Sequence, residues 1–216
     1  MTMAPDLLQR LCEAELARLW GSQSDGAHDL GHVRRVLANA RILALNEGGA
    51  DDAVLVPAAI LHDAVNLPKD HPERHRASVL SAEAAADFLA GLADYPAEKI
   101  PGVAHAIAAH SFSAGIAPET PEAMILQDAD RLEALGAIGL ARMFHVAGQM
   151  GGGLFDADDP LARRRPLDDR RFALDHLEVK LFPVAAGMRT TAGRQMAEER
   201  AEWMESFRAR LLREIQ

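Results

Sequence analysis

The chain has 216 residues, of which 49% are hydrophobic and 25% are charged, and its formal net charge is -9 at pH 7. These values are typical of a soluble globular protein with one sizeable core. The acidic balance argues against broad binding to a nucleic-acid polymer, which needs a basic surface. No apolar run approaches the ~18 residues of a membrane span, and no signal peptide is recognisable. Cys12 is the single cysteine, so no intrachain disulfide can form, and we expect a cytoplasmic protein without a membrane partner.

Apolar residues recur at three- and four-residue spacing and aromatic residues make up only 5%, which predicts an all-α fold. In chain order, the predicted helices are residues 5–20, a helix that carries His32 and ends at Gly48, a helix that Asp51 caps and that leads to His62, and residues 73–92, 96–110, 121–132, 134–147, 168–182 and 192–214. The stretch 148–169 is too long for an ordinary helix connection. Its glycine triplet suits a mobile surface loop or a substrate lid, of which we favour the loop, and we interpret the arginines of residues 163–165 as solvated surface.

A histidine-aspartate doublet, His62 and Asp63, follows the apolar run of residues 54–61, and His32 precedes it by 30 positions. An unpaired carboxylate is expensive to bury, and a divalent cation compensates for it. Downstream, Asp128 and Asp130 lie in another apolar run. Because two positions along a helix differ by about 200 degrees, we expect one of these aspartates to be a ligand and the other to support it. Helical periodicity does not choose between them, but the pattern predicts a metal site.

Four segments, in their order along the chain, resemble the HD superfamily of metal-dependent phosphohydrolases, and in particular the bacterial subgroup that includes nucleotide pyrophosphatases. They are His28-Asp-Leu-Gly-His-Val-Arg-Arg-Val36, Ala59-Ile-Leu-His-Asp63, His110-Ser-Phe112 and Gln127-Asp-Ala-Asp-Arg-Leu-Glu-Ala-Leu-Gly-Ala-Ile-Gly139. The resemblance covers nearly the whole chain. It implies a single-domain, all-α HD-type helical bundle over residues 1–216, with a metal-binding core over about residues 25–145 and C-terminal helices over about residues 168–214.

The resemblance also implies which residues bind the metal. The family's fourth ligand is similar to the aspartate of an Ala-Asp-Arg-Leu element, which corresponds to Asp130. The implied ligands are therefore His32, His62, Asp63 and Asp130, and Asp128 is expected to orient a histidine or a water. A mixed nitrogen and oxygen site of this kind accepts Mn, Mg, Fe, Co, Ni or Zn, and we favour manganese. An octahedral ion with four protein ligands would keep two positions for a water and a phosphate oxygen.

Candidate substrate ligands lie near these residues. Arg35 follows His32 by three positions and so shares its helix face, and Lys69 follows the doublet by six. Asn66 stands where several HD nucleotide hydrolases place an acidic residue, so it could orient a water but not act as a base, and Asp128 or the metal would have to activate the nucleophile. The resemblance further implies that His110 protonates the leaving group or binds a phosphate, and that Lys180 contacts the substrate.

The implied activity is divalent-metal-dependent hydrolysis of a small phosphorylated substrate. A nucleoside or deoxynucleoside triphosphate, cleaved with release of pyrophosphate, is the first choice, and a nucleotide monophosphate or another phosphomonoester is the second. Cyclic dinucleotide hydrolysis is disfavoured because the chain has no Gly-Tyr-Pro element. A non-catalytic metal or nucleotide sensor and an HD oxygenase with two irons stay open. Residues 196–212 could close the core or contact another subunit, so a homodimer also stays open.

Overall fold

The structure is a computed structural model that describes residues 3–21, 29–67 and 71–215. These residues are helical apart from their connections and one isolated β-bridge between Gly153 and Phe172. The all-α prediction is confirmed. The chain forms two compact units, Met1–Asp130 and Arg131–Gln216, and the single domain inferred from the sequence stays a prediction. None of the described helices is both long and apolar enough to cross a membrane.

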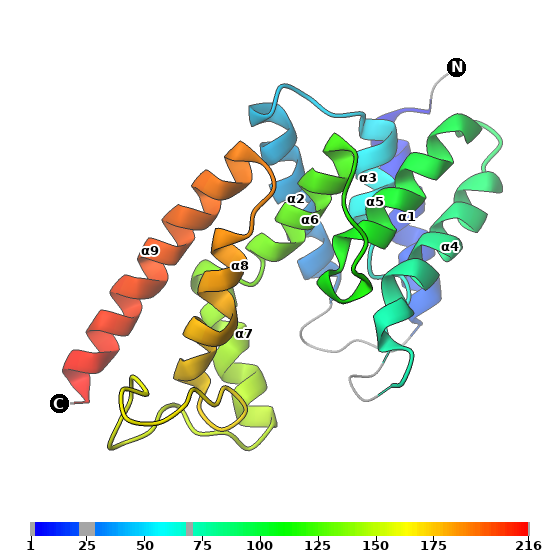
Figure 1. The fold of residues 1–216 in the computed structure, drawn as a ribbon. Helices are drawn as coiled ribbons and strands as arrows, with labels where there is room; N and C mark the ends of the chain where they lie inside the picture. The colour runs from blue at the N-terminus through cyan, green and yellow to red at the C-terminus, as the bar shows by residue number, and fades with distance from the viewer. Residues whose placement is uncertain (1–2, 22–28, 68–70, 216) are drawn as a thin grey trace. The chain divides into compact units, whose positions relative to one another are not determined.

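The first unit contains helices α1 to α6, which are labelled in Figure 1. They are α1 (Pro5–Trp20), α2 (Leu30–Asn46), α3 (Asp52–Leu61), α4 (Ala77–Ala90), α5 (Ile100–His110) and α6 (Pro121–Leu132), which crosses into the second unit at its last turn. Short 3-10 turns precede or follow some of them: η1 (Arg74–Arg76), η2 (Ala97–Lys99) and η3 (Phe112–Ala114). The predicted helices 73–92 and 96–110 therefore each begin with a 3-10 turn.

The centre of the first unit is α3. Every residue of α3 from Val54 to Leu61 is buried, and the side chain of Asp51 caps the helix by accepting a hydrogen bond from the backbone N–H of Ala53, which confirms the predicted cap. A helix that is apolar on all sides has to be covered all round. Helices α1, α2 and α5 pack against it, with fewer contacts from α4. The doublet thus emerges from the most deeply buried helix of the unit.

The second unit contains α7 (Gly136–Gln149), a 3-10 turn η4 (Ala173–Asp175), a π-helical turn η5 (Leu177–Leu181), α8 (Phe182–Ala186) and α9 (Thr191–Glu214), with α7 and α8 packed on α9. The prediction of one helix over residues 168–182 is wrong. The N–H groups of Ala173 and Leu174 donate at 2.9 Å to the carbonyls of Gly153 and Leu154. Because these donors serve a distant segment, a regular helix cannot form there.

The connection over residues 148–169 is anchored rather than purely solvated. Arg165 donates to both carboxylate oxygens of Asp175, at 2.5 and 2.9 Å, and the backbone N–H of Asp168 donates to the same carboxylate at 2.7 Å. Asp175 is only 2% exposed, and the Arg165 guanidinium lies 4.5 Å from the centre of the Phe172 ring. The interpretation of the arginine run as solvated surface is therefore wrong for Arg165.

Candidate metal centre

His62 and Asp63 lie where α3 ends. The helix stops at Leu61, and His62 is its C-cap residue rather than an interior one. The His62 side chain is fully buried, and its Nδ1 donates to the carbonyl of Ala59 at 2.8 Å. A proton held at Nδ1 leaves the lone pair of the neutral ring at Nε2. That nitrogen is buried and has no hydrogen-bond partner within the described part of the chain. His62 is thus oriented as a metal ligand would be.

His32 reaches the same point from α2. Asp29 is the N-cap of this helix, and its side chain accepts a 2.7 Å hydrogen bond from the backbone N–H of His32. This bond fixes the first turn of α2, and with it the position of the His32 ring, which is 2% exposed. An aspartate three residues before a histidine at a helix start was a readable signal for this cap.

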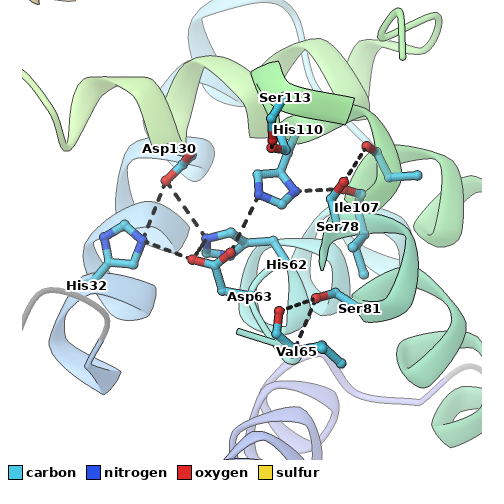
Figure 2. A network of polar contacts seen from close by, with 12 residues as sticks. His32, His62, Asp63, Val65, Ser78, Ser81, Ile107, His110, Ser113 and Asp130 are labelled. Carbon is cyan, nitrogen blue, oxygen red and sulfur yellow. Dashed lines mark hydrogen bonds and ion pairs between the residues drawn. The ribbon is translucent and has the colours of Figure 1, made fainter. Parts of the chain in front are cut away.

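Asp130 comes from α6 and completes the cluster (Figure 2). Its carboxylate lies 3.5 Å from His32 Nε2 and 3.9 Å from His62 Nε2. Two amide side chains hold α6 beside its neighbours: Asn39 of α2 donates to the carbonyl of Ala129, and Gln127 donates to the carbonyl of Ala109 in α5. The carbonyl groups of the residues just before Asp130 and just before His110 are thus each bonded to a neighbouring helix.

The distances between the histidine nitrogens and the carboxylate oxygens are those that binding to one ion requires. Oδ2 of Asp63 lies 3.3 Å from His62 Nε2 and 4.0 Å from His32 Nε2. Together with the distances to Asp130, the four histidine-to-carboxylate distances lie between 3.3 and 4.0 Å. Atoms bound at about 2.1 Å to one octahedral ion stand about 3.0 Å apart when adjacent and about 4.2 Å apart when opposite. The set of imidazole nitrogens and carboxylate oxygens fits Mn, Fe, Co, Ni or Zn. These residues therefore fit a divalent cation.

The electrostatics of the cluster favour a positive charge at its centre. Burial lowers the pKa of His62, but the carboxylates of Asp63 and Asp130 raise it by more, to about 9. For Asp63 the effects are reversed. Burial raises its pKa, but the charge of His62 and the contacts with His62 and His110 hold the pKa well below its usual range. A proton on His62 partly neutralises the two carboxylates, and a divalent metal ion, with its larger charge, neutralises them more fully.

His110 extends the cluster on the other side of Asp63. Its Nδ1 donates to the carbonyl of Ile107 at 2.6 Å, and its Nε2 lies 3.6 Å from Asp63 Oδ1. His62, Asp63 and His110 form a second group whose potential ligand atoms lie within 4.8 Å of one another, as do those of His32, His62 and Asp130. The two carboxylate oxygens of Asp63 thus face different histidines.

The other predicted site residues are placed differently. Asp128 is fully buried in α6 and belongs to neither ligand group, and Asn66 is exposed just after the doublet. Arg35 is partly exposed in α2, with its guanidinium beside Gly31 in the first turn. Lys180 is exposed on the π-helical turn of the second unit. Lys69 lies outside the described residues. The structure thus brings together His32, His62, Asp63, His110 and Asp130.

The chain is similar to known HD-domain proteins. An HD-domain family model matches residues 29–135. The YpgQ protein of Bacillus subtilis (strain 168) is 31% identical over 216 residues, with 96% of each chain covered. The crystal structure of an HD-superfamily hydrolase from Bacillus thuringiensis has a TM-score of 0.74 at 29% identity and covers 98% of each chain. The crystal structure of Bacillus subtilis YpgQ in complex with ADP has a TM-score of 0.67 at 27% identity and covers 97% of this chain and 94% of that one.

An all-helical unit with buried imidazoles and half-buried carboxylates converging at the end of one apolar helix defines a metal-dependent phosphohydrolase. The chain belongs to the HD superfamily, as its extended match to YpgQ and the HD-domain model together show.

Proposed function

We propose that the protein hydrolyses nucleoside or deoxynucleoside triphosphates and releases pyrophosphate. The metal-dependent part of this proposal is supported by the short distances from His32 and His62 to the carboxylates of Asp63 and Asp130. The nucleotide part is supported by the resemblance of the chain to nucleotide pyrophosphatases and by the ADP complex of YpgQ. The bond to be cleaved is the phosphoanhydride between the α- and β-phosphates, so a nucleoside monophosphate is the second product.

In this proposal His32, His62, Asp63 and Asp130 hold the cation, for which we favour Mn²⁺. When bound, the cation supplies Lewis acidity and neutralises charge on the phosphoryl group. The two sides of the cluster differ in solvent exposure, because the side chains of Asp63 and Asp130 are 26% and 30% exposed whereas the two histidines are buried. The substrate therefore approaches from the carboxylate side of the cluster.

His110 is the proposed proton donor to the leaving pyrophosphate. Its Nδ1 bond to Ile107 fixes the ring, so that Nε2 is the atom that can hold and release a proton toward the cluster. That nitrogen lies 3.6 Å from Asp63 Oδ1, which places it at the edge of the proposed metal centre. His110→Gln should lower kcat more than it changes KM, because the glutamine amide can bind a phosphate but cannot donate a labile proton.

The remaining proposed contacts are to the triphosphate. Arg35, on the helix face of His32, and Lys69 are the proposed phosphate ligands, and Lys180 is a further proposed substrate contact. Asn66 is proposed to orient the attacking water through its amide. Asp128 is proposed to support the cluster from within α6, where it is fully buried two residues before the half-buried Asp130.

A product-resolved assay tests the function. Nucleoside triphosphates, deoxynucleoside triphosphates and phosphomonoesters are incubated with Mn²⁺, and phosphate and pyrophosphate are measured separately for the wild type and Asp63→Ala. Asp52→Ala is the matched control, because Asp52 is an exposed aspartate in the first turn of α3, the helix that leads to Asp63. We expect pyrophosphate from triphosphates with the wild type and the control, and none with Asp63→Ala.

Other outcomes identify the alternatives. Asp63-dependent phosphate release from monoesters would move the protein to the phosphomonoesterases. Nucleotide binding without turnover under Mn²⁺, Mg²⁺, Co²⁺, Ni²⁺, Zn²⁺ or Fe²⁺ would favour a sensor and would contradict the proposed hydrolysis.

A further inference from the structure

The backbone of His62 and Asp63 departs from regular helical geometry at the point where it sets the positions of two proposed ligands. Helix α3 ends at Leu61, and the N–H of Ala64 bonds back only three residues, to the carbonyl of Leu61 at 3.1 Å. The last carbonyls of a helix have no partner within it and take donors from elsewhere. Residues 63–65 are therefore held by contacts from other helices.

Trp20 holds this segment from the side of α1. Its indole Nε1 donates to the main-chain carbonyl of Asp63 at 3.0 Å. Helix α1 carries none of the clustered histidines and aspartates, but it packs closely on α3, and its Cys12 and Leu16 side chains are fully buried. This places the indole, at the last residue of α1, directly against the residue that carries a candidate ligand.

Ser81 holds the same segment from the side of α4. Its hydroxyl accepts a 3.0 Å hydrogen bond from the N–H of Val65 and lies 3.4 Å from the carbonyl oxygen of Val65, to which it donates (Figure 2). The Ser81 side chain is fully buried. A buried hydroxyl that serves both backbone groups of one residue restrains that peptide in position and in orientation.

We propose that Trp20 and Ser81 are positioning residues of the metal centre, which clamp residues 63–65 from two helices and so set the affinity for the cation. This inference rests on the proposed metal centre. Asp63 is the residue on which a shift would have the largest effect, because Oδ2 faces His62 and His32 while Oδ1 faces His110. A rotation of its main chain moves both oxygens at once. Partners that orient ligands in this way commonly change metal affinity by about 10- to 100-fold.

Binding of Mn²⁺ alone, followed by the EPR signal of the free ion, tests the clamp without an activity assay. Trp20→Phe keeps an aromatic ring but removes the N–H donor, and Ser81→Ala removes only the hydroxyl. Each variant removes hydrogen bonding between uncharged groups, which contributes only a modest free energy. We therefore expect each variant to raise the Kd for Mn²⁺ by about 3- to 10-fold.

Two matched controls separate positioning from stability. Trp203→Phe makes the same substitution at the second tryptophan, which stacks on Phe207 in the other unit. Ser78→Ala removes a buried hydroxyl one turn before Ser81 that donates to the carbonyl of Ala108 instead of to residues 63–65. We expect both controls to stay within about twofold of the wild-type Kd, even though Ser78→Ala also lowers the Tm.

The outcomes are distinct. Kd values for Trp20→Phe and Ser81→Ala that match those of the controls would overturn the clamp and leave the metal centre intact. A wild-type protein that binds no Mn²⁺ would overturn the metal centre and the clamp together. If the clamp variants do not fold, the Trp203→Phe protein with ¹⁵N-labelled tryptophan serves instead. Its single indole N–H resonance should shift on titration with Zn²⁺, and an unchanged resonance at saturating Zn²⁺ would contradict the inference.

Discussion

The hydroxyl of Tyr95 donates a 2.6 Å hydrogen bond to the main-chain carbonyl of Ala53 in α3. In a regular helix the N–H of residue 57 would serve that carbonyl, but residue 57 is a proline and has no N–H. Tyr95 is only 6% exposed, so the bond is made away from water. The tyrosine thereby supplies the donor that the proline removes, and α3 continues through Pro57 to the doublet.

Tyr95→Phe should lower the free energy of unfolding by about 1–3 kcal/mol, because it leaves the partly buried carbonyl of Ala53 without a donor. Urea denaturation measures the loss. The same substitution in a Pro57→Ala background, where residue 57 has an N–H of its own, should cost clearly less. Equal costs in the two backgrounds would show that Tyr95 acts only through packing.

Arg165→Lys should destabilise the second unit by about 2–4 kcal/mol. A lysine cannot make the two parallel bonds to Asp175 or lie flat against Phe172, and a half-paired buried carboxylate remains. Thermal unfolding and limited proteolysis between residues 148 and 176 report the effect. Arg163→Lys, two residues away and exposed, is the control and should change the Tm little. Comparable losses for both arginines would refute the anchoring role.

Asp130→Asn should abolish the stabilisation that Mn²⁺ gives, whereas Asp128→Asn should retain it. A ligand present at 100 times its Kd stabilises the native state by about 2.7 kcal/mol, which is readily seen as a rise in Tm. Asp130 lies against His32 and His62, and Asp128 is in neither ligand group. Thermal scans with Mn²⁺ and with a chelator distinguish the two variants. The reverse pattern would make Asp128 the ligand.

Cys12 should resist thiol reagents while the protein is folded. Burial, with a smaller effect of the Glu15 charge, raises the pKa of its thiol to about 12. At pH 8 only about one native molecule in ten thousand then carries the reactive thiolate. Reaction with DTNB at pH 8 should be slow in buffer and rapid in urea. Because the unfolded thiol loses its proton near pH 9.0, this residue's contribution to stability is present below that pH and is lost between about pH 9 and pH 12. Fast labelling of the native protein would contradict the burial of Cys12.

Much of the fold and of the cluster followed from local patterns and from the family resemblance. The helical spacing of apolar residues predicts α1 to α7 to within a few residues, since each of these helices presents a face to a core. Spacing alone could not choose between Asp128 and Asp130, because both aspartates lie in the same apolar run. The resemblance pointed to Asp130, and the structure places its carboxylate beside His32 and His62.

The contacts that the sequence did not reveal join residues far apart along the chain. Trp20 and Asp63 are 43 residues apart, and Tyr95 and Ala53 are 42 apart. Neither pair has a periodicity that would expose it, because each depends on which helices become neighbours after folding. The same limit explains the wrong helix over residues 168–182, where pairing with Gly153 and Leu154 overrides local propensity.

The imidazoles of the cluster are sealed in the core, whereas its carboxylates border the solvent. We therefore expect a cation to enter and leave on the side of Asp63 and Asp130, where the cluster borders the solvent. Exchange of the ion would then depend on the dissociation of its bonds to these residues and not on the rate of unfolding. The metal that a folded molecule holds should consequently change with the divalent ions available in solution, without unfolding of the protein.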